Sequence, residues 1–377
     1  MESILNTLKN IRNSGDFSIN PQNSNRYRIV VWENDGSQTA YYFSAPIYEQ
    51  DTLKLVKPSF FSSAEGYTAK GSNSSINIDK DGVRFSSPVG MARIIHDLPN
   101  FQIENGKLIA NRLKILPTIN GAVFLCDVSG KKGITFRVHT DQSFLGIRSN
   151  SKYFALMHEE FRPFFLVSSI GTYNQYDQLV EPALVAYQML DDKQYLVHIY
   201  PSNSDNDVKV MFECNMYEEK LFQDTTVESK NPDENNAFGG VGFIGNSNAF
   251  GEQWLYSRLN YNKLSELFGR IIGKAVLHIP KFNNGVPLIG VGIQQRFCSF
   301  GSNWNNKIND SYTVSETTEN NGFYKISITD LLINRHTRNF NMSEGLILKT
   351  KAKESGFSAI ATGDNYYAPQ VLEINFR

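Results

Sequence analysis

Residues 75–85 read Ser-Ile-Asn-Ile-Asp-Lys-Asp-Gly-Val-Arg-Phe. Apolar and polar side chains alternate over the first five residues, Lys80-Asp81-Gly82 is typical of a tight turn, and the alternation resumes at Val83. A period of two places successive side chains on opposite faces of a strand, so this stretch predicts a β-hairpin with one buried face. Calcium loops also use closely spaced aspartates, but the further oxygen donors and the distal glutamate of an EF-hand are missing here. The turn is therefore the preferred interpretation, and a weak calcium site at a sandwich edge stays open.

The same signal recurs along the chain at short intervals. Aromatic residues make up 12% of the sequence, with 26 Phe and 18 Tyr, and such side chains favour strands. Besides the hairpin, strands are predicted at 27–32, 40–43, 121–127, 133–138, 163–169, 183–190, 194–200, 207–214, 253–261, 274–280, 288–293, 323–328, 345–350, 356–361 and 369–376. Helices are expected at 1–13 and, briefly, at 329–335. The predicted fold class is all-β: two antiparallel β-sandwich (jelly-roll-like) domains with a short N-terminal helix.

Composition shifts suggest the domain boundaries. Residues 14–26 are polar and rich in turn formers, which is typical of a tether, so the N-terminal helix and tether are placed at 1–26. A stretch rich in Gly and Asn at 228–251 opens the last part of the chain. We therefore expect a first β-sandwich domain at 27–215 and a second, jelly-roll-like domain at 216–377.

Charge and hydropathy narrow the possible partners. The chain has 37 Lys plus Arg and 38 Asp plus Glu, a formal charge of −1, so no global field attracts nucleic acid or an acidic membrane. No stretch approaches the ~20 apolar residues of a membrane-spanning helix, so no membrane insertion is predicted. The first residues lack the basic and apolar regions of a secretory signal, and none is expected.

The reactive side chains follow no catalytic or metal-binding pattern. Cys126, Cys214 and Cys298 are odd in number and far apart, which predicts free thiols rather than a disulfide framework. The six histidines never pair at ligand spacing, and His278, inside an alternating strand, is interpreted as structural or surface-facing. No metal site, no cofactor and no catalytic residue are predicted, and the chain is expected to be non-enzymatic.

One loop is the best candidate for ligand contact. Trp304 lies in the polar sequence Gly-Ser-Asn-Trp-Asn-Asn at 301–306. Exposed Trp rings stack on sugars, because their apolar faces match the C–H face of a pyranose. Trp304, with Asn303 and Asn305, is therefore the predicted ligand-binding site. The alternative is that Trp304 anchors the loop on the sandwich.

The N-terminal helix carries a second predicted site. Its apolar face consists of Ile4, Leu5, Leu8 and Ile11. A helix this short is marginal alone and has to dock on something. The prediction is a partner-binding attachment element that contacts another protein or a second copy of the chain. The alternative is a helix folded back on its own domain.

The C-terminal ~160 residues contain an ordered series of short apolar segments: Leu255-Tyr256-Ser257-Arg258-Leu259, Ala275-Val276-Leu277-His278-Ile279-Pro280, Ile328-Thr329-Asp330-Leu331-Leu332, Gly345-Leu346-Ile347-Leu348-Lys349 and Pro369-Gln370-Val371-Leu372-Glu373-Ile374. The order and spacing of these segments resemble a known family, the DNRLRE domain. The signature Arg-Glu pair before the last strand is missing. The resemblance implies a jelly-roll-like accessory domain that binds or scaffolds, often on glycans of bacterial surfaces, and it brings no catalytic residue. In the first half, Tyr42-Phe43-Ser44-Ala45-Pro46-Ile47-Tyr48 resembles uncharacterised Firmicutes prophage proteins.

Together these observations lead to an expected function. The chain is expected to be a non-enzymatic structural or binding protein of a phage or phage-like particle, tail- or virion-associated, with host-surface glycans as a ligand. Its expected partners are the other structural proteins of the particle, further copies of itself and polysaccharide. Its expected location is a virion or extracellular particle assembled in the cytoplasm. The alternatives are a carbohydrate-binding protein of the bacterial cell surface and a glycan-active enzyme.

Overall fold

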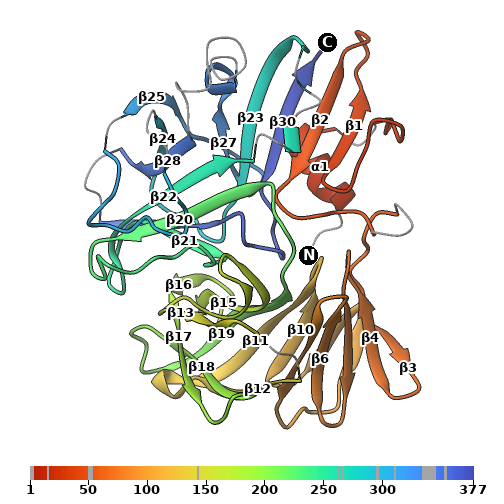
Figure 1. The fold of residues 1–377 in the computed structure, drawn as a ribbon, viewed down its shortest axis with the longest axis vertical. Helices are drawn as coiled ribbons and strands as arrows, with labels where there is room; N and C mark the ends of the chain where they lie inside the picture. Colours follow the sequence, from red (N-terminus) through yellow and green to blue (C-terminus); the bar gives the residue numbers. More distant parts are fainter. Residues whose placement is uncertain are drawn as a thin grey trace. The chain divides into compact units, whose positions relative to one another are not determined.

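The computed structural model describes residues 4–14, 17–49, 54–141, 144–260, 263–264, 267, 269–293, 297–309, 311–332, 345–351 and 355–377, without the side chains of 311–316. Antiparallel strands make up most of this part of the chain, and one short helix, α1 (Ile4–Arg12), lies near its start (Figure 1). The predicted all-β class with a short N-terminal helix is confirmed. Smaller helical turns occur at η1 (Gly130–Lys132) and at 329–332, and the rest of the helix predicted at 329–335 lies outside the described residues.

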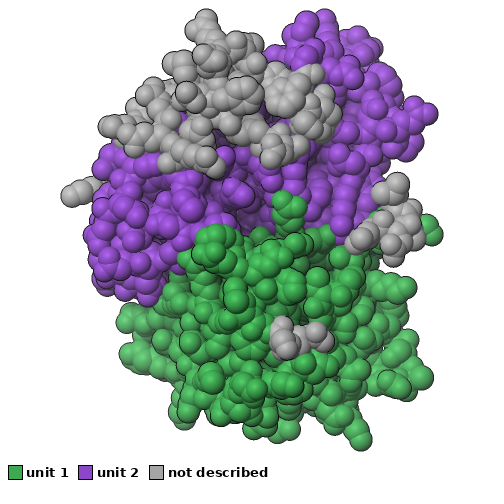
Figure 2. Space-filling view, in the orientation of Figure 1, with its two compact units in different colours: residues 1, 49–219, 238–240 green, residues 2–48, 220–237, 241–377 purple. Residues whose placement is uncertain are grey.

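The chain divides into two compact units (Figure 2). Unit 1 is formed mainly by residues 49–219, and unit 2 by the segment before residue 49 together with 220–237 and 241–377. This division corrects the predicted first domain at 27–215, because residues 27–48 belong to unit 2. The physical reason is strand pairing: Phe43 lies opposite Val371, near the C-terminus, in an antiparallel ladder.

Unit 1 consists of two antiparallel sheets. Sheet I has the strand order β13 (Gly146–Ser149), β14 (Tyr153–Glu159), β15 (Arg162–Tyr173), β19 (Asp207–Met216), β11 (Gly121–Ser129), β10 (Leu113–Pro117), β9 (Lys107–Ala110) and β8 (Gln102–Glu104), with β16 (Leu179–Glu181) beside β15. Sheet II has the order β17 (Ala183–Met189), β18 (Gln194–Pro201), β12 (Ile134–Thr140), β7 (Gly90–Ile95), β6 (Gly82–Ser87), β5 (Ser75–Asp79), β4 (Gly66–Lys70) and β3 (Phe61–Ser63). The hairpin predicted at 75–85 is β5 and β6, with Asp79 opposite Gly82.

The core of unit 1 lies between its two sheets and is rich in aromatic rings. Phe212 of sheet I stacks on Phe124 of the same sheet at a centroid distance of 5.1 Å. It also stacks on Phe136 of sheet II at 5.2 Å. Since Phe212 is 1% exposed, this stack joins the two layers within a dry interior.

Unit 2 is built in the same way. Sheet III has the order β1 (Arg28–Trp32), β2 (Gln38–Phe43), β30 (Val371–Phe376), β23 (Ile272–Pro280), β27 (Phe323–Ser327) and β26 (Thr318–Asn320). Sheet IV has the order β25 (Ser311–Glu316), β24 (Leu288–Ile293), β28 (Gly345–Thr350), β22 (Gly251–Leu259), β21 (Val241–Ser247) and β29 (Gly356–Ala361), with β20 (Phe222–Glu228) also beside β22. The apolar core of unit 2 combines side chains from both sheets. The chain passes from one sheet to the other repeatedly, as β22, β23 and β24 illustrate.

The predicted tether is part of the sheet system rather than a free connection. Ile19 forms a β-bridge with Val31 of β1, and the backbone N–H of Asn20 donates to the carbonyl of Val30 at 2.7 Å. These bonds extend the edge of sheet III beyond β1. The N-terminal segment is therefore part of unit 2 both before and after residues 15–16, which the structure does not describe: the apolar face of helix α1 is largely buried, and Ile19 and Asn20 pair with β1.

Candidate functional site

Strand alternation gives sheet III a polar outer face. On β23, Ala275, Leu277 and Ile279 belong to the core, so the residues between them point to the opposite side of the sheet. A β-bulge between Ile272 and Lys274 sets this phase, because Ile272 still packs against the core. The outward residues of the four central strands include Tyr41, Lys274, Val276, His278, Lys325, Ser327 and Glu373.

The register of the sheet brings these residues together from segments far apart in sequence. Glu373 on β30 lies between Tyr41 on β2 and Val276 on β23. In the neighbouring row, His278 on β23 lies opposite Lys325 on β27. Directly opposite residues on one face are 4.5–5.5 Å apart at Cβ as a rule, so these side chains form a single cluster.

The end of helix α1 covers part of this cluster. The Arg12 guanidinium donates to both carboxylate oxygens of Glu33, at 2.8 and 3.0 Å, and to the Tyr41 hydroxyl at 2.8 Å. The residue after the helix, Asn13, accepts a hydrogen bond from the Asn321 amide at 2.7 Å, in the turn between β26 and β27. The helix is thus attached to both halves of sheet III.

A cavity of about 570 Å³ remains between the helix end and the sheet, and we call it the α1 cavity. Its lining residues are Ile11, Arg12, Asn13, Glu33, Tyr41, Lys274, Val276, His278, Thr318, Lys325, Ser327 and Glu373. Nearly all of them carry hydrogen-bonding groups. The size falls in the ~300–1,000 Å³ range of small-ligand sites.

The buried end of the cavity contains a histidine–carboxylate pair. His278 is 1% exposed, and its Nε2 lies 2.8 Å from Oε2 of Glu373. Burial pushes the pKa of Glu373 upward, but the hydrogen bond from His278 and the charge of Lys274 outweigh burial, so that pKa lies below its usual 4.5. Burial lowers the pKa of His278 below 6.5 against the opposing effect of Glu373. A neutral imidazole beside an ionised carboxylate has to donate through Nε2.

This tautomer decides what the pair can do. With the proton on Nε2, the lone pair of His278 is on Nδ1, which is buried and has no hydrogen-bond partner among the described residues. The other oxygen of Glu373 accepts a hydrogen bond from Lys274 at 3.2 Å. The basic nitrogen of the histidine is thus shielded from the cavity, while the charged groups around it are held in place.

The arginine side of the cavity is also saturated. Its hydrogen bond to Glu33 raises the pKa of Arg12, and the same bond lowers the pKa of Glu33, so both groups are charged across the ordinary pH range. Burial raises the pKa of Tyr41, which keeps its hydroxyl protonated. These groups offer a fixed pattern of donors and acceptors rather than a titrating acid or base.

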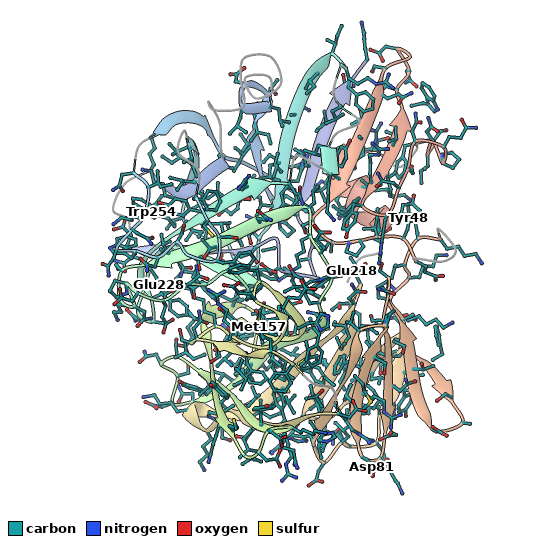
Figure 3. All side chains as sticks on the ribbon, viewed as in Figure 1. Tyr48, Asp81, Met157, Glu218, Glu228 and Trp254 are labelled. Atoms are coloured by element: carbon teal, nitrogen blue, oxygen red, sulfur yellow. The ribbon has the colours of Figure 1, made fainter. Side chains whose placement is uncertain are left out.

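The structure places the predicted ligand-binding residues elsewhere in unit 2. The Trp304 ring packs against Trp254 of β22 at a centroid distance of 5.5 Å. Trp254 is labelled in Figure 3. Lys307 Nζ lies 3.9 Å from the Trp304 ring centroid, and the Trp304 backbone N–H donates to Pro232. Both rings are half-buried against a small apolar cluster. These contacts are those of a loop anchor.

The two predicted asparagines make bonds within and beside the same loop. Asn305 donates to Asp233 Oδ1 at 2.7 Å, and Asn303 Oδ1 accepts from the backbone N–H of Asn306 at 3.1 Å. The predicted trio therefore stays together, as neighbours in sequence do. It lies outside the α1 cavity, whose lining contains none of the three.

The apolar face of the predicted attachment helix is largely buried within the chain. Ile4, Leu8 and Ile11 are 3%, 0% and 4% exposed, and Leu5 is half-buried. The helix therefore adopts the folded-back arrangement, the alternative left open by the sequence. Binding of a partner through these four residues stays a prediction, and it would require them to leave this position.

A second buried polar cluster joins β20 to the loop before β30. Lys220 Nζ lies 2.8 Å from Asp364 Oδ1, and Asp224 accepts a hydrogen bond from the backbone N–H of Gly363. Burial raises the pKa of both carboxyl groups, and the negative charge of Asp364 raises that of Asp224 further. Asp224 is thus held protonated against a paired Asp364. The residues of the cluster are 2–4% exposed, so the cluster lies in the interior and not at a surface open to a ligand.

Three further observations bear on the remaining predictions. In the part of the chain that the structure describes, no group of three or more His, Cys, Asp or Glu side chains could hold a metal ion. Within the same residues, no helix is long and apolar enough to cross a membrane. Cys126, Cys214 and Cys298 are all free, the first two buried and the third exposed.

Sequence reasoning missed the cavity because most of its lining residues are ordinary strand residues. The alternating strand around His278 predicts a structural or surface-facing side chain, and nothing near it in sequence marks Lys325 or Glu373. The signal in the sequence is the set of polar residues that alternate with apolar ones in the predicted strands at 274–280, 323–328 and 369–376. This signal points to a site only when it is known that the three strands are neighbours in one sheet. Comparison with known proteins adds no further guide: no protein-family model and no curated protein matches this chain.

Proposed function

We propose that the protein is a non-enzymatic structural and binding protein of a phage or phage-like particle, and that unit 2 binds a host-surface glycan in the α1 cavity. The observation that carries the binding part is the cavity itself, about 570 Å³ and lined by donors and acceptors. Saccharide hydroxyls both donate and accept, so they need both kinds of group at close spacing. Lys274 and Lys325 supply donors, and the carboxylates of Glu33 and Glu373 supply acceptors.

The pairing of these groups favours binding over turnover. The Arg12–Glu33 and His278–Glu373 pairs are formed within the chain, so little ordering of side chains is left for a ligand to impose. A glycosidase needs one carboxylic acid that donates a proton and a second carboxylate that attacks or activates water. The two cavity carboxylates have lowered pKa values, and neither supplies that acid near neutral pH.

The particle part of the proposal rests on the architecture and on the sequence resemblance. Two all-β units suit a scaffold that presents a binding face, and the sequence resemblance implies a jelly-roll-like fold for the C-terminal part. The proposed partners are other structural proteins of the particle and further copies of this chain. Mass spectrometry of purified particles from the producing strain tests this part: the chain in stoichiometric amounts supports it. Recovery only in the cell-envelope fraction would favour a cell-surface protein instead.

The binding site is tested with two variants of the full chain. Thr318 is exposed and lies opposite Lys325 in the β26–β27 ladder, so Thr318→Trp places a bulky ring over the cavity. Trp304→Ala removes the ring of the loop predicted from sequence. A glycan array identifies a ligand for the wild-type chain, and both variants are then compared with it. Loss of binding in Thr318→Trp alone supports the cavity, whereas loss in Trp304→Ala alone supports the loop.

A further inference from the structure

The charges around the α1 cavity do not cancel. Arg12 and Glu33 neutralise each other through two hydrogen bonds. Glu373 is matched by Lys274, at 3.2 Å, while its second oxygen accepts from the neutral His278. Among the lining side chains, three cations then face two carboxylates, a net charge of +1.

The excess charge is located on Lys325. This side chain forms no ion pair or hydrogen bond with any residue that the structure describes. It is half-buried, on β27, with its neighbours His278 and Thr318 directly opposite on β23 and β26. A partly desolvated ammonium group interacts with an anion more strongly than one in open water does. The cavity thus contains one cation that lacks a counter-charge, beside the hydroxyls of Thr318 and Ser327.

We propose that the glycan bound in the α1 cavity carries a single carboxylate, as a uronic acid does, and that Lys325 binds this carboxylate. The proposal rests on the proposed glycan-binding function and names the class of sugar. In it, the carboxylate lies at the β27 side of the cavity, nearest Lys325 and farthest across the sheet from Glu33. The hydroxyls of the same sugar face the paired groups Glu373 and Lys274.

The charge balance selects a carboxylate over the two other common cases. A neutral sugar would leave the Lys325 ammonium without a counter-charge in a partly enclosed site. A phosphate monoester carries about −1.5 to −2 near pH 7, which exceeds the net charge of the cavity and would be repelled by the carboxylate of Glu373. One negative charge matches the excess of one positive charge.

The test compares three probes that share the glucose ring and differ at C6, on the full chain: glucuronic acid, glucose and glucose 6-phosphate. Dissociation constants are measured by NMR titration in low salt near pH 7. Lys325→Met keeps the length of the side chain and removes its charge. Lys349→Met is the matched control, because Lys349 packs over the Trp254 ring and does not line the cavity. Melting curves confirm that both variants are folded.

We expect glucuronic acid to bind at least tenfold tighter than glucose or glucose 6-phosphate. Lys325→Met is expected to reduce glucuronic acid binding to the level of glucose, while Lys349→Met leaves it unchanged. Equal binding of glucuronic acid and glucose by the wild-type chain would overturn the carboxylate proposal and leave the glycan proposal standing. Preference for glucose 6-phosphate would also overturn it. If no probe and no glycan on an array binds, both proposals are wrong.

Discussion

The substitution Leu8→Ala tests whether helix α1 is part of unit 2 or an attachment element. Leu8 is 0% exposed at the centre of the apolar face of the helix. The change removes three carbon atoms, worth ~0.8 kcal/mol each by transfer, and leaves a cavity that adds to the cost. We therefore expect the free energy of unfolding of unit 2 to fall by about 2–3 kcal/mol. Lys9→Ala, on the exposed side of the same helix, is the matched control and should cost less than ~0.5 kcal/mol.

The assay is urea unfolding followed by far-UV circular dichroism, with sedimentation velocity on the same samples. For a folding unit of roughly 200 residues, the expected loss corresponds to a melting point lower by about 4–12 °C. The reasoning is refuted if Leu8→Ala unfolds like Lys9→Ala. If, in addition, Leu8→Ala loses self-association or incorporation into particles, Leu8 acts by binding a partner. It then does not act by holding the helix against unit 2.

Three other predictions concern the interior and the thiols. Asp224 has a raised pKa in the folded chain, so its contribution to stability is complete below the unfolded pKa of 3.8 and is lost as the pH rises through the folded pKa. The free energy of unfolding of Asp224→Asn should therefore rise relative to that of the wild type by up to ~1.4 kcal/mol per pH unit above 3.8, until the folded pKa is reached. Urea unfolding from pH 4 to 8 measures this difference, and a difference that does not change with pH would contradict the prediction. Phe212→Ala should destabilise unit 1 by about 3–5 kcal/mol in thermal or urea unfolding, because the ring stacks on both sheets, and a loss below ~1 kcal/mol would show that the stack contributes little. Thiol titration should find one fast-reacting group, Cys298, in the native protein and three in denaturant, whereas a single thiol in denaturant would mean that a disulfide exists.

The local sequence accounts for the strands that carry a strong period-two signal. The hairpin at 75–85 forms as predicted because alternation and turn chemistry act over a few residues and point the same way. Prediction was poorer where the pattern is short or rich in glycine. β21 (Val241–Ser247) lies within the stretch that reads as a Gly/Asn-rich lead-in, and it is nevertheless a strand between β22 and β29. Pairing with β29 supplies its ladder hydrogen bonds, and the fold buries its phenylalanine, Phe243. These non-local contacts, more than its own propensity, make the segment a strand.

Local side-chain periods are sufficient to predict the all-β class, the short helix at the start and most strand positions, because neighbours in the chain share these periods. Which strands lie side by side is visible only in the folded chain. Because β2 pairs with β30, the N-terminal segment is part of unit 2. Because β23 pairs with β27 and β30, His278, Lys325 and Glu373 lie on one face of the sheet. Such non-local pairing depends on the burial of whole sheet faces, and that free energy belongs to no single stretch of sequence.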